Sequence, residues 1–262
     1  MFTEKEKYDI NDLLEITRML RSENGCPWDK EQDHKSIRMN VLEEAYEVME
    51  AIDSEDAELL KEELGDLMFQ AVFHAQLESE KGTFDFNDVC DGICRKLVYR
   101  HPHVFGDISV DNTEQVLKNW DALKSKAKGE TKASDRLDSV PKLLPALMRG
   151  EKVGKRAGNV GFDFSDTNQV LDCLKSEIAE LEAAVEQGED NAIEDELGDI
   201  LFSCCNLARF LKKDSEKALT FSINKFIMRF RVIERLAENK GLKLSEMSAE
   251  QQNDLWKQAK EK

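Results

Sequence analysis

Apolar residues recur along the chain at the spacing of α-helices. Val41, Ala45, Val48 and Ile52 fall within an arc of about 60° on a wheel of 3.6 residues per turn. Two further stripes follow the same rule, and they consist of Leu64, Met68, Ala71 and Ala75, and of Leu174, Ile178, Leu181 and Val185. The alternation of a strand is absent. The pattern predicts an all-α protein in which pairs of helices meet by these stripes.

Composition agrees with long helices and places the chain among cytoplasmic proteins. Its 262 residues can bury one large core or two modest ones, and only 13 glycines and 4 prolines interrupt them. The N-terminal stretch "MFTEKEKYDIND" lacks the apolar core of a signal peptide, and no run approaches the roughly 18 apolar residues of a membrane span. The six cysteines show no C-x-x-C spacing. We expect a cytoplasmic protein without a membrane partner.

The charge of the chain narrows its ligands. A formal net charge of −17, from 54 acidic and 37 basic residues, repels the phosphate backbone of DNA or RNA. Nucleic acid is therefore not an expected partner. A small phosphate-bearing ligand remains compatible with the sequence if cations link it to the acidic residues.

The chain also contains a long internal repeat. "EELGDLMF" begins at Glu62 and "DELGDILF" at Asp195, which is a separation of 133 residues, and the same separation relates "E-x-x-E" at Glu44 to "E-x-x-E" at Glu177. Further on, "KLVYR" at Lys96 matches "KFIMR" at Lys225. A repeat of this length predicts two related domains, residues 1–128 and 146–262. Residues 129–145 are the predicted linker, because prolines disfavour helix at the residues that precede them.

Within each half, the repeat places two pairs of carboxylates on neighbouring helices. Residues three apart on a helix are neighbours, so the pairs converge when the helices pack. The first-half set is Glu44, Glu47, Glu63 and Asp66, and the second-half set is Glu177, Glu180, Glu196 and Asp199. Two such charges about 4 Å apart repel by about 4 kcal/mol at an effective dielectric constant near 20. A divalent cation relieves this repulsion, and oxygen ligands favour Mg²⁺, with Mn²⁺ as a substitute.

The alternative to a metal site is an ordinary solvated helix face, which is the usual meaning of a single E-x-x-E. The pairing of E-x-x-E with E-x-x-D, and its repetition at one separation, favour the metal site. Gly65 and Gly198 interrupt these helices at a cost of about 1 kcal/mol each relative to alanine, and a close approach of helices is the simplest reason for them.

A basic pair and a tryptophan extend the second-half set. Lys225 and Arg229 lie four residues apart on one helix face, a spacing suited to binding phosphate groups, although salt bridges to acidic residues are the alternative. Trp256 either stacks on a base or packs in the core.

The acidic motifs carry a family resemblance. "EEAYE" at residues 43–47 followed by "EELGD" at 62–66 resembles the E-E-x-x-E and E-x-x-D signature of the MazG nucleoside triphosphate pyrophosphohydrolases. The stretches "GCPWDKEQ", "RHPHVFGD", "LPALMRGEKVGKRAGNVGFDF" and "NLARFL" extend the resemblance to two-domain bacterial MazG across nearly the whole chain. It implies two tandem MazG-like helical-bundle domains, a homodimer, Mg²⁺ dependence, and conversion of an NTP or dNTP and water to the monophosphate and pyrophosphate.

The resemblance also implies roles for particular residues. The second copy is the catalytic one in tandem members of the family, so the catalytic and metal-binding roles fall on Glu177, Glu180, Glu196 and Asp199. The first-half set is then a second metal site. Contacts with the nucleotide fall on Lys225, Arg229 and Trp256. One departure stands out, since "SEIAE" carries Ser176 where the first half has Glu43.

Two other functions stay open at this stage. The chain could be a metal-dependent dimerisation or regulatory module without catalysis, or a pyrophosphatase specific for a single deoxynucleotide. The sequence does not decide base or sugar preference.

Overall fold

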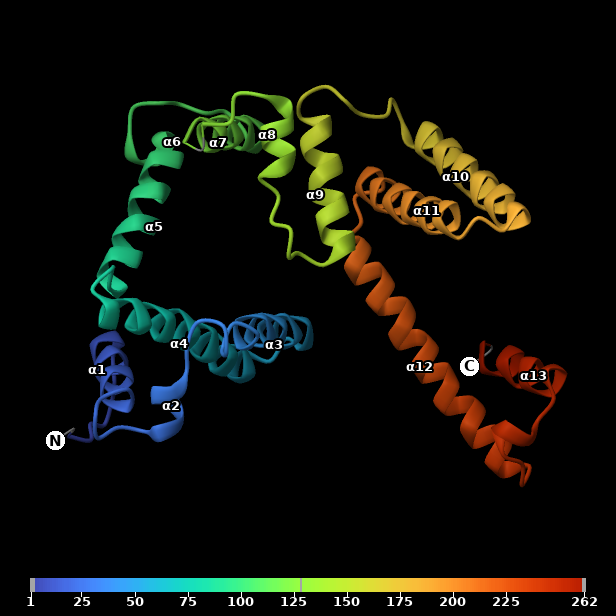
Figure 1. Cartoon of the computed structure of the whole chain (residues 1–262), viewed down its shortest axis with the longest axis horizontal. Coiled ribbons are helices and arrows are strands. Elements are labelled where there is room, and N and C mark those ends of the chain that lie inside the picture. Colours follow the sequence, from blue (N-terminus) through green and yellow to red (C-terminus); the bar gives the residue numbers. More distant parts are fainter. Residues whose placement is uncertain (1–2, 128, 261–262) are drawn as a thin grey trace. The chain divides into compact units, whose positions relative to one another are not determined.

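The computed structural model describes residues 3–127 and 129–260, and every regular element in that part of the chain is helical (Figure 1). The prediction of an all-α fold is confirmed. The chain divides into two compact units between Lys124 and Ser125, called unit 1 and unit 2 below. None of the described helices is long and apolar enough to cross a membrane.

Unit 1 is built from a helical hairpin and shorter helices. Its elements are α1 (Ile10–Leu20), α2 (Pro27–Glu31), α3 (Asn40–Ser54), α4 (Ala57–Lys81), α5 (Phe86–Arg100), α6 (Pro102–Phe105) and α7 (Thr113–Ala127), the last of which crosses the boundary. Asp9 and Asp56 accept hydrogen bonds from the first backbone N–H groups of α1 and α4. Gly82 ends α4 in the left-handed conformation (φ 72°), which glycine adopts without strain.

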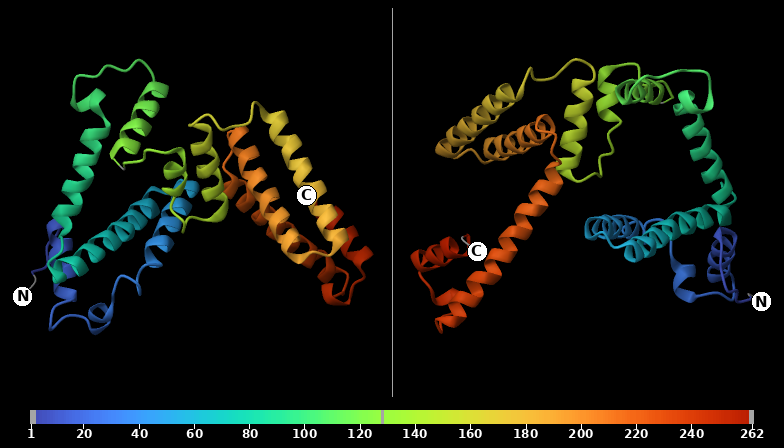
Figure 2. Two further views of the ribbon diagram at one scale, coloured as in Figure 1. Left: turned by 45° about the horizontal axis from the view of Figure 1, so that its top comes forward. Right: turned by 180° about the vertical axis from the view of Figure 1, so that it is seen from behind.

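The hairpin of α3 and α4 positions the first acidic set. The two helices lie along each other in Figures 1 and 2, and α1 packs against α4. The core beside them consists of Ile37, Phe73 and Leu77, with Phe69 partly buried against it. Buried apolar area of this kind stabilises the unit by about 25 cal/mol per Å².

Unit 2 repeats the hairpin and adds a long helix. Its elements are α8 (Ala133–Asp138), α9 (Ala146–Gly158), α10 (Thr167–Gln187), α11 (Asp190–Phe210), α12 (Ser215–Asn239), the short 3₁₀ helix η1 (Leu244–Glu246) and α13 (Ala249–Lys260). The segment predicted as a linker, residues 129–145, contains α8, which packs against α9.

Packing in unit 2 divides between the hairpin and the long helix. Helices α10 and α11 turn at Gly188 (φ 70°) and lie along each other, and α9 packs against α11 (Figures 1 and 2). Helix α13 packs on α12 through a core of Ile233, Ala237, Leu255 and Ala259.

The predicted contact faces of the hairpins differ from the observed ones. Ile52 is 55% exposed, Leu64 49% and Val185 57%, so the stripes of Val41, Leu64 and Leu174 do not join the helices of a single chain by most of their members. The buried faces are centred instead on Ala51 and Val72 in unit 1 and on residues such as Ala184 in unit 2. The apolar residues cover more than one side of each helix, and the hairpin uses only one of these sides.

Candidate functional site

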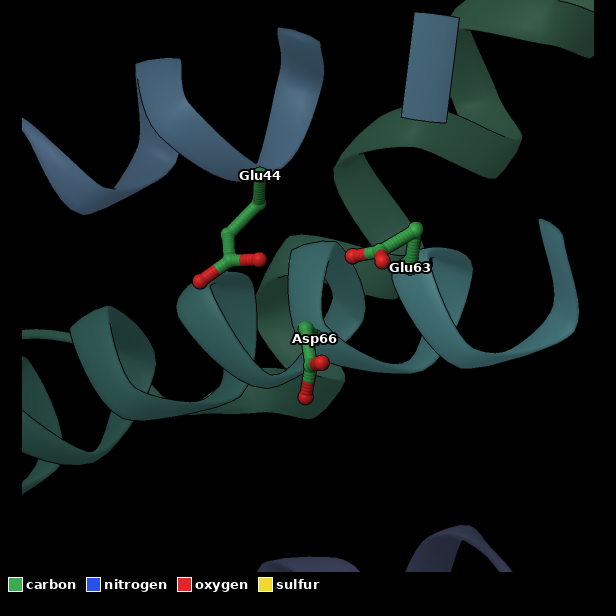
Figure 3. A group of neighbouring side chains, drawn as sticks. All are labelled: Glu44, Glu63 and Asp66. Atoms are coloured by element: carbon green, nitrogen blue, oxygen red, sulfur yellow. The ribbon is translucent and has the colours of Figure 1, made fainter. Parts of the chain in front are cut away.

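Three carboxylates of unit 1 meet across the α3–α4 hairpin. Glu44 comes from α3 and Glu63 and Asp66 from α4, and the three side chains point toward one another (Figure 3). Each offers an oxygen within 4.8 Å of the others. Glu44 and Glu63 are half-buried and Asp66 is exposed, so the group lies at the surface with one open side. The convergence predicted from the repeat is present.

Unit 2 holds the matching group across α10 and α11. Glu177, Glu196 and Asp199 each bring an oxygen within 4.8 Å of the others, with the same order of burial. The position of each residue corresponds to its partner in unit 1 in both helix and sequence. The two hairpins therefore build the same constellation twice.

The electrostatics show that these carboxylates repel one another. Burial raises the pKa of Glu196, and the neighbouring charges of Glu180 and Glu177 raise it further. In unit 1, burial and then the charge of Asp66 raise the pKa of Glu44. A site with raised carboxyl pKa values and no cationic side chain among the causes attracts a cation.

The fourth carboxylate of each predicted set stands next to its group. Glu180 raises the pKa of Glu196 through its charge, and its Oε1 accepts a hydrogen bond of 2.9 Å from Ser176 Oγ. Glu47 interacts in the same way with Glu63 in unit 1. The residue that departs from the family motif, Ser176, therefore holds the fourth carboxylate of unit 2.

The residues present fit a hard divalent cation. All three donors in each group are carboxylate oxygens, which Mg²⁺ and Mn²⁺ prefer over Zn²⁺. Mg–O bonds of about 2.1 Å place the ligand oxygens of one ion about 3 to 4 Å apart. The observed spacing is compatible with this requirement after small side-chain movements.

A pocket of about 450 Å³ opens beside the carboxylates of unit 2. Glu177 and Asp199 form part of its wall, and Arg209 and Asp163 form another part through an ion pair with N–O distances of 2.6 and 2.8 Å. The Cys173 thiol lines it too, at 3.4 Å from Glu177 Oε1, and burial raises the pKa of this thiol. The sequence analysis did not select Cys173 or Asp163 as site residues.

The predicted nucleotide contacts lie elsewhere in unit 2. Asp199 is in the first half of α11, whereas Lys225 is near the middle of α12, which leads away from α10 and α11 (Figure 1). Arg229 stacks over Trp256 with 5.9 Å from Cζ to the ring centre, and Trp256 packs against the core between α12 and α13. A single chain does not bring these residues to the pocket of Glu177.

The same arginine–tryptophan contact occurs in unit 1. Arg100 Cζ lies 5.4 Å from the ring centre of Trp120, and the ring of His101 meets that of Trp120 edge to face at 4.7 Å. Arg100 and Arg229 occupy matching positions in "KLVYR" and "KFIMR". The repeat thus extends beyond the hairpin, to a cation–π contact in each unit.

The explanation given for the two helix glycines was wrong for a single chain. A methyl group added at Gly65 or Gly198 would meet no described atom within 4 Å. The helices of the same unit do not approach closely there, so these glycines face open space beside the acidic groups.

Comparison with known proteins decides the family. The model of the MazG nucleotide pyrophosphohydrolase domain matches residues 32–105 and again residues 165–232, which are the two hairpins with their acidic groups. The chain belongs to the MazG nucleotide pyrophosphohydrolase family. The double match also confirms the two tandem helical domains.

Two relatives share the MazG repeat over their full length. The chain is 45% identical over 257 residues to a nucleoside triphosphate pyrophosphohydrolase of Escherichia coli strain K12, covering 96% of this chain and 97% of that protein. It is 41% identical to the nucleoside triphosphate pyrophosphohydrolase/pyrophosphatase MazG of Thermotoga maritima, covering 96% and 95%. The similarity therefore includes both units and the segment between them.

Proposed function

We propose that the chain is a nucleoside triphosphate pyrophosphohydrolase that converts an NTP or dNTP and water to the monophosphate and pyrophosphate. The observation that carries this proposal is the match of the MazG family model to both hairpins, each with three convergent carboxylates. The names of full-length relatives support the same reaction.

Mg²⁺ is the proposed cofactor, held by Glu177, Glu196 and Asp199 in unit 2 and by Glu44, Glu63 and Asp66 in unit 1. The all-oxygen donor set and the raised carboxyl pKa values support this assignment. When bound, Mg²⁺ supplies a Lewis acid that activates water and neutralises charge on the phosphate oxygens. We place the catalytic site in unit 2, in line with the sequence resemblance.

The side chains of unit 2 divide the remaining work. Glu180 lies outside the group of three and is oriented by Ser176, so it accepts the proton of the attacking water. Cys173 and Ser203 lie within 3.8 Å of each other and limit water on the inner side of Glu177. Lys225 and Arg229 stabilise charge on the leaving pyrophosphate. Because they lie on α12, this last role requires α12 of a second copy at the carboxylates.

A homodimer is the second part of the proposal. The apolar stripes next to the acidic groups are exposed in the single chain, at Leu64 and Met68 in unit 1 and at Leu197 and Leu201 in unit 2. Gly65 and Gly198 lie within these stripes and leave room for a close neighbour. Helix α12 carries further exposed apolar side chains, which are Leu219, Phe221, Ile223, Phe226, Ile227, Met228 and Phe230. Exposed apolar surface of this extent is typical of an obligate interface. Light scattering should give twice the monomer mass.

Product analysis tests the reaction. The purified protein is incubated with a panel of NTPs and dNTPs and Mg²⁺, and the products are separated without added pyrophosphatase. We expect monophosphate and pyrophosphate in equal amounts, and no turnover by Glu196→Gln purified in the same way, which excludes a contaminating enzyme. A nucleoside diphosphate with orthophosphate would refute the proposal. Turnover of one deoxynucleotide alone would narrow the substrate to that nucleotide.

A further inference from the structure

The pocket of unit 2 follows one face of the α10–α11 hairpin. Its wall on α11 is formed by residues three or four apart, namely Asp199, Phe202, Ser203, Asn206 and Arg209. Its wall on α10 is formed by Glu177, Cys173 and Gln169, which are spaced at four residues. At 1.5 Å per residue, the stretch from Asp199 to Arg209 is about 15 Å long. The pocket is therefore a groove that starts at the carboxylates and extends one nucleotide's length from them.

The chemistry of the groove changes along its length. The carboxylate end is anionic and suits a metal ion with phosphates. Beyond it the lining is aromatic, with Phe162, Phe164 and Phe202, and the charges of Asp163 and Arg209 neutralise each other. A volume of about 450 Å³ lies within the usual range for small-molecule sites. Flat aromatic ligands stack on such rings.

Two small polar side chains form the floor of the groove. Ser203 and Asn206 are each 5% exposed. Asn206 Oδ1 accepts a hydrogen bond of 3.0 Å from Arg209 Nη2, and its Nδ2 donates one of 3.3 Å to the backbone oxygen of Phe202. An amide has two donors and two acceptor positions, so one of each stays available to a ligand. Gly154 of α9 makes room here, because a methyl group at that position would lie 2.4 Å from Asn206 Oδ1.

Unit 1 has large side chains at the matching positions. At the repeat separation of 133 residues, Ser203 corresponds to Gln70 and Asn206 to Phe73. Phe73 is 3% exposed and packs with Ile37 and Leu77, and Gln70 is 7% exposed and donates to Glu44 at 3.4 Å. The guanidinium of Arg21 covers the ring of Phe73 at 5.2 Å. Side chains thus occupy in unit 1 the space that forms the groove in unit 2.

We propose that this groove binds the nucleobase and sugar of the substrate, and that Ser203 and Asn206 keep it open. The inference rests on the proposed function and specifies it, since it assigns recognition of the nucleoside to unit 2 alone. The two acidic groups then differ in a definable way. Both fit a metal ion and phosphates, but only the group of unit 2 adjoins a site for the base among the described residues.

Filling the groove with the residues of unit 1 tests the proposal. The double variant Ser203→Gln/Asn206→Phe is made in the full chain, and binding of ATP, GTP, CTP and UTP is measured by calorimetry with Ca²⁺. Inorganic tripolyphosphate, which has no base, is the second probe. We expect wild type to bind at least one nucleotide about tenfold or more tightly than tripolyphosphate, and the double variant to lose that difference while its affinity for tripolyphosphate is unchanged. Unchanged nucleotide affinity, or an equal loss for both probes, would overturn the proposal.

A milder substitution guards against misfolding of the double variant. Phe162 lines the groove and is 82% exposed, so Phe162→Ala leaves the fold intact. Loss of one stacking ring should weaken nucleotide binding about fivefold or more and leave tripolyphosphate binding unchanged. Cys204→Gln is the matched control, because Cys204 lies on α11 outside the groove and is exposed. An effect of Cys204→Gln equal to that of Phe162→Ala would count against the groove.

The binding measurement separates this inference from the proposed reaction. Nucleotide binding that depends on Ser203 and Asn206, without release of pyrophosphate when Mg²⁺ is supplied, would refute the reaction and support the groove. Release of pyrophosphate by wild type, with nucleotide affinity unchanged in both groove variants, would refute the groove and leave the reaction standing.

Discussion

Ser176 Oγ donates a hydrogen bond of 2.9 Å to Glu180 Oε1, one helical turn further along α10. Ser176 stands where the first half of the chain has Glu43, so the second half lacks one carboxylate of the motif. The hydroxyl orients Glu180 without adding a charge to a crowded group. Partners of this kind commonly change metal affinity or activity by about 10–100-fold when removed.

We therefore predict that Ser176→Ala raises the Mg²⁺ concentration at half-maximal rate by about tenfold. The measurement is the initial rate of pyrophosphate release as a function of Mg²⁺. Lys175→Ala is the control, because Lys175 is exposed and pairs with Asp172. Equal Mg²⁺ dependence in wild type and Ser176→Ala would show that Glu180 needs no such support.

The two halves should differ in their contribution to turnover. Glu196→Gln and Glu63→Gln each remove one charge at matching positions without changing side-chain size. We expect Glu196→Gln to lower the rate by about 100-fold or more and Glu63→Gln by less than about threefold, since the groove adjoins Glu177 and Asp199. Steady-state rates, with folding checked by circular dichroism, provide the test. Loss of activity in Glu63→Gln alone would move the catalytic site to unit 1.

Removal of metal should abolish turnover and lower stability together. Excess chelator is expected to stop pyrophosphate release, and Mg²⁺ or Mn²⁺ to restore it, because the donors are oxygens. A cation bound only by the folded state also raises the unfolding temperature. In the double variant Glu63→Gln/Glu196→Gln, the rise caused by Mg²⁺ should become much smaller. Full activity in chelator would contradict the metal site.

A histidine pair makes the stability of unit 1 sensitive to pH. His34 Nδ1 lies 2.8 Å from His74 Nδ1, and His34 Nε2 lies 2.6 Å from Glu78 Oε1. Burial and the neighbouring His34 lower the pKa of His74. Protonation of His74 therefore favours the unfolded state, so its contribution is complete above about pH 6.5 and is lost as the pH falls below that value.

The variant His74→Gln isolates this contribution. We expect the unfolding temperature of wild type to fall more steeply than that of the variant between pH 7.5 and pH 5.5. The comparison with the variant is needed because the raised carboxyl pKa of Glu44 acts in the opposite direction at low pH. Parallel pH profiles for the two proteins would show that the histidine pair has no effect.

The acidic groups could be predicted from the sequence because they depend on local geometry. Glu63 and Asp66 are neighbours on any helix, and the repeat places Glu44 on the adjacent helix of the same hairpin. The helices themselves follow from apolar periodicity and from caps such as Asp56, which accepts from the N–H groups of Glu58 and Leu59.

The contact faces and the groove could not be predicted in the same way. Leu64 and Met68 have the spacing of a core stripe, yet they are exposed in the single chain, because periodicity does not say which neighbour covers a stripe. The groove depends on the small size of Ser203 and Asn206 relative to Gln70 and Phe73. A comparison of the two repeats at these positions contained that signal, but the aligned acidic residues drew attention instead.

Trp256 separates a packing role from a role in nucleotide binding. Its ring is half-buried against the core of α12 and α13, 5.2 Å from the ring of Phe226, and Arg229 and Lys260 stack on it. We predict that Trp256→Ala lowers the free energy of unfolding by about 3 kcal/mol, because it leaves a cavity beside Leu255. Trp256→Phe keeps an aromatic ring there and should cost less than about 1.5 kcal/mol.

The activity of Trp256→Phe then decides between the two roles. If Trp256 acts by packing α13 and holding Arg229, the phenylalanine variant should bind ATP as wild type does, while the alanine variant loses stability and binding together. Urea unfolding and calorimetric ATP binding, measured on the same preparations, give both quantities. A phenylalanine variant that is stable but binds ATP at least about tenfold more weakly would show that the indole ring contacts the nucleotide itself, as the sequence resemblance implies.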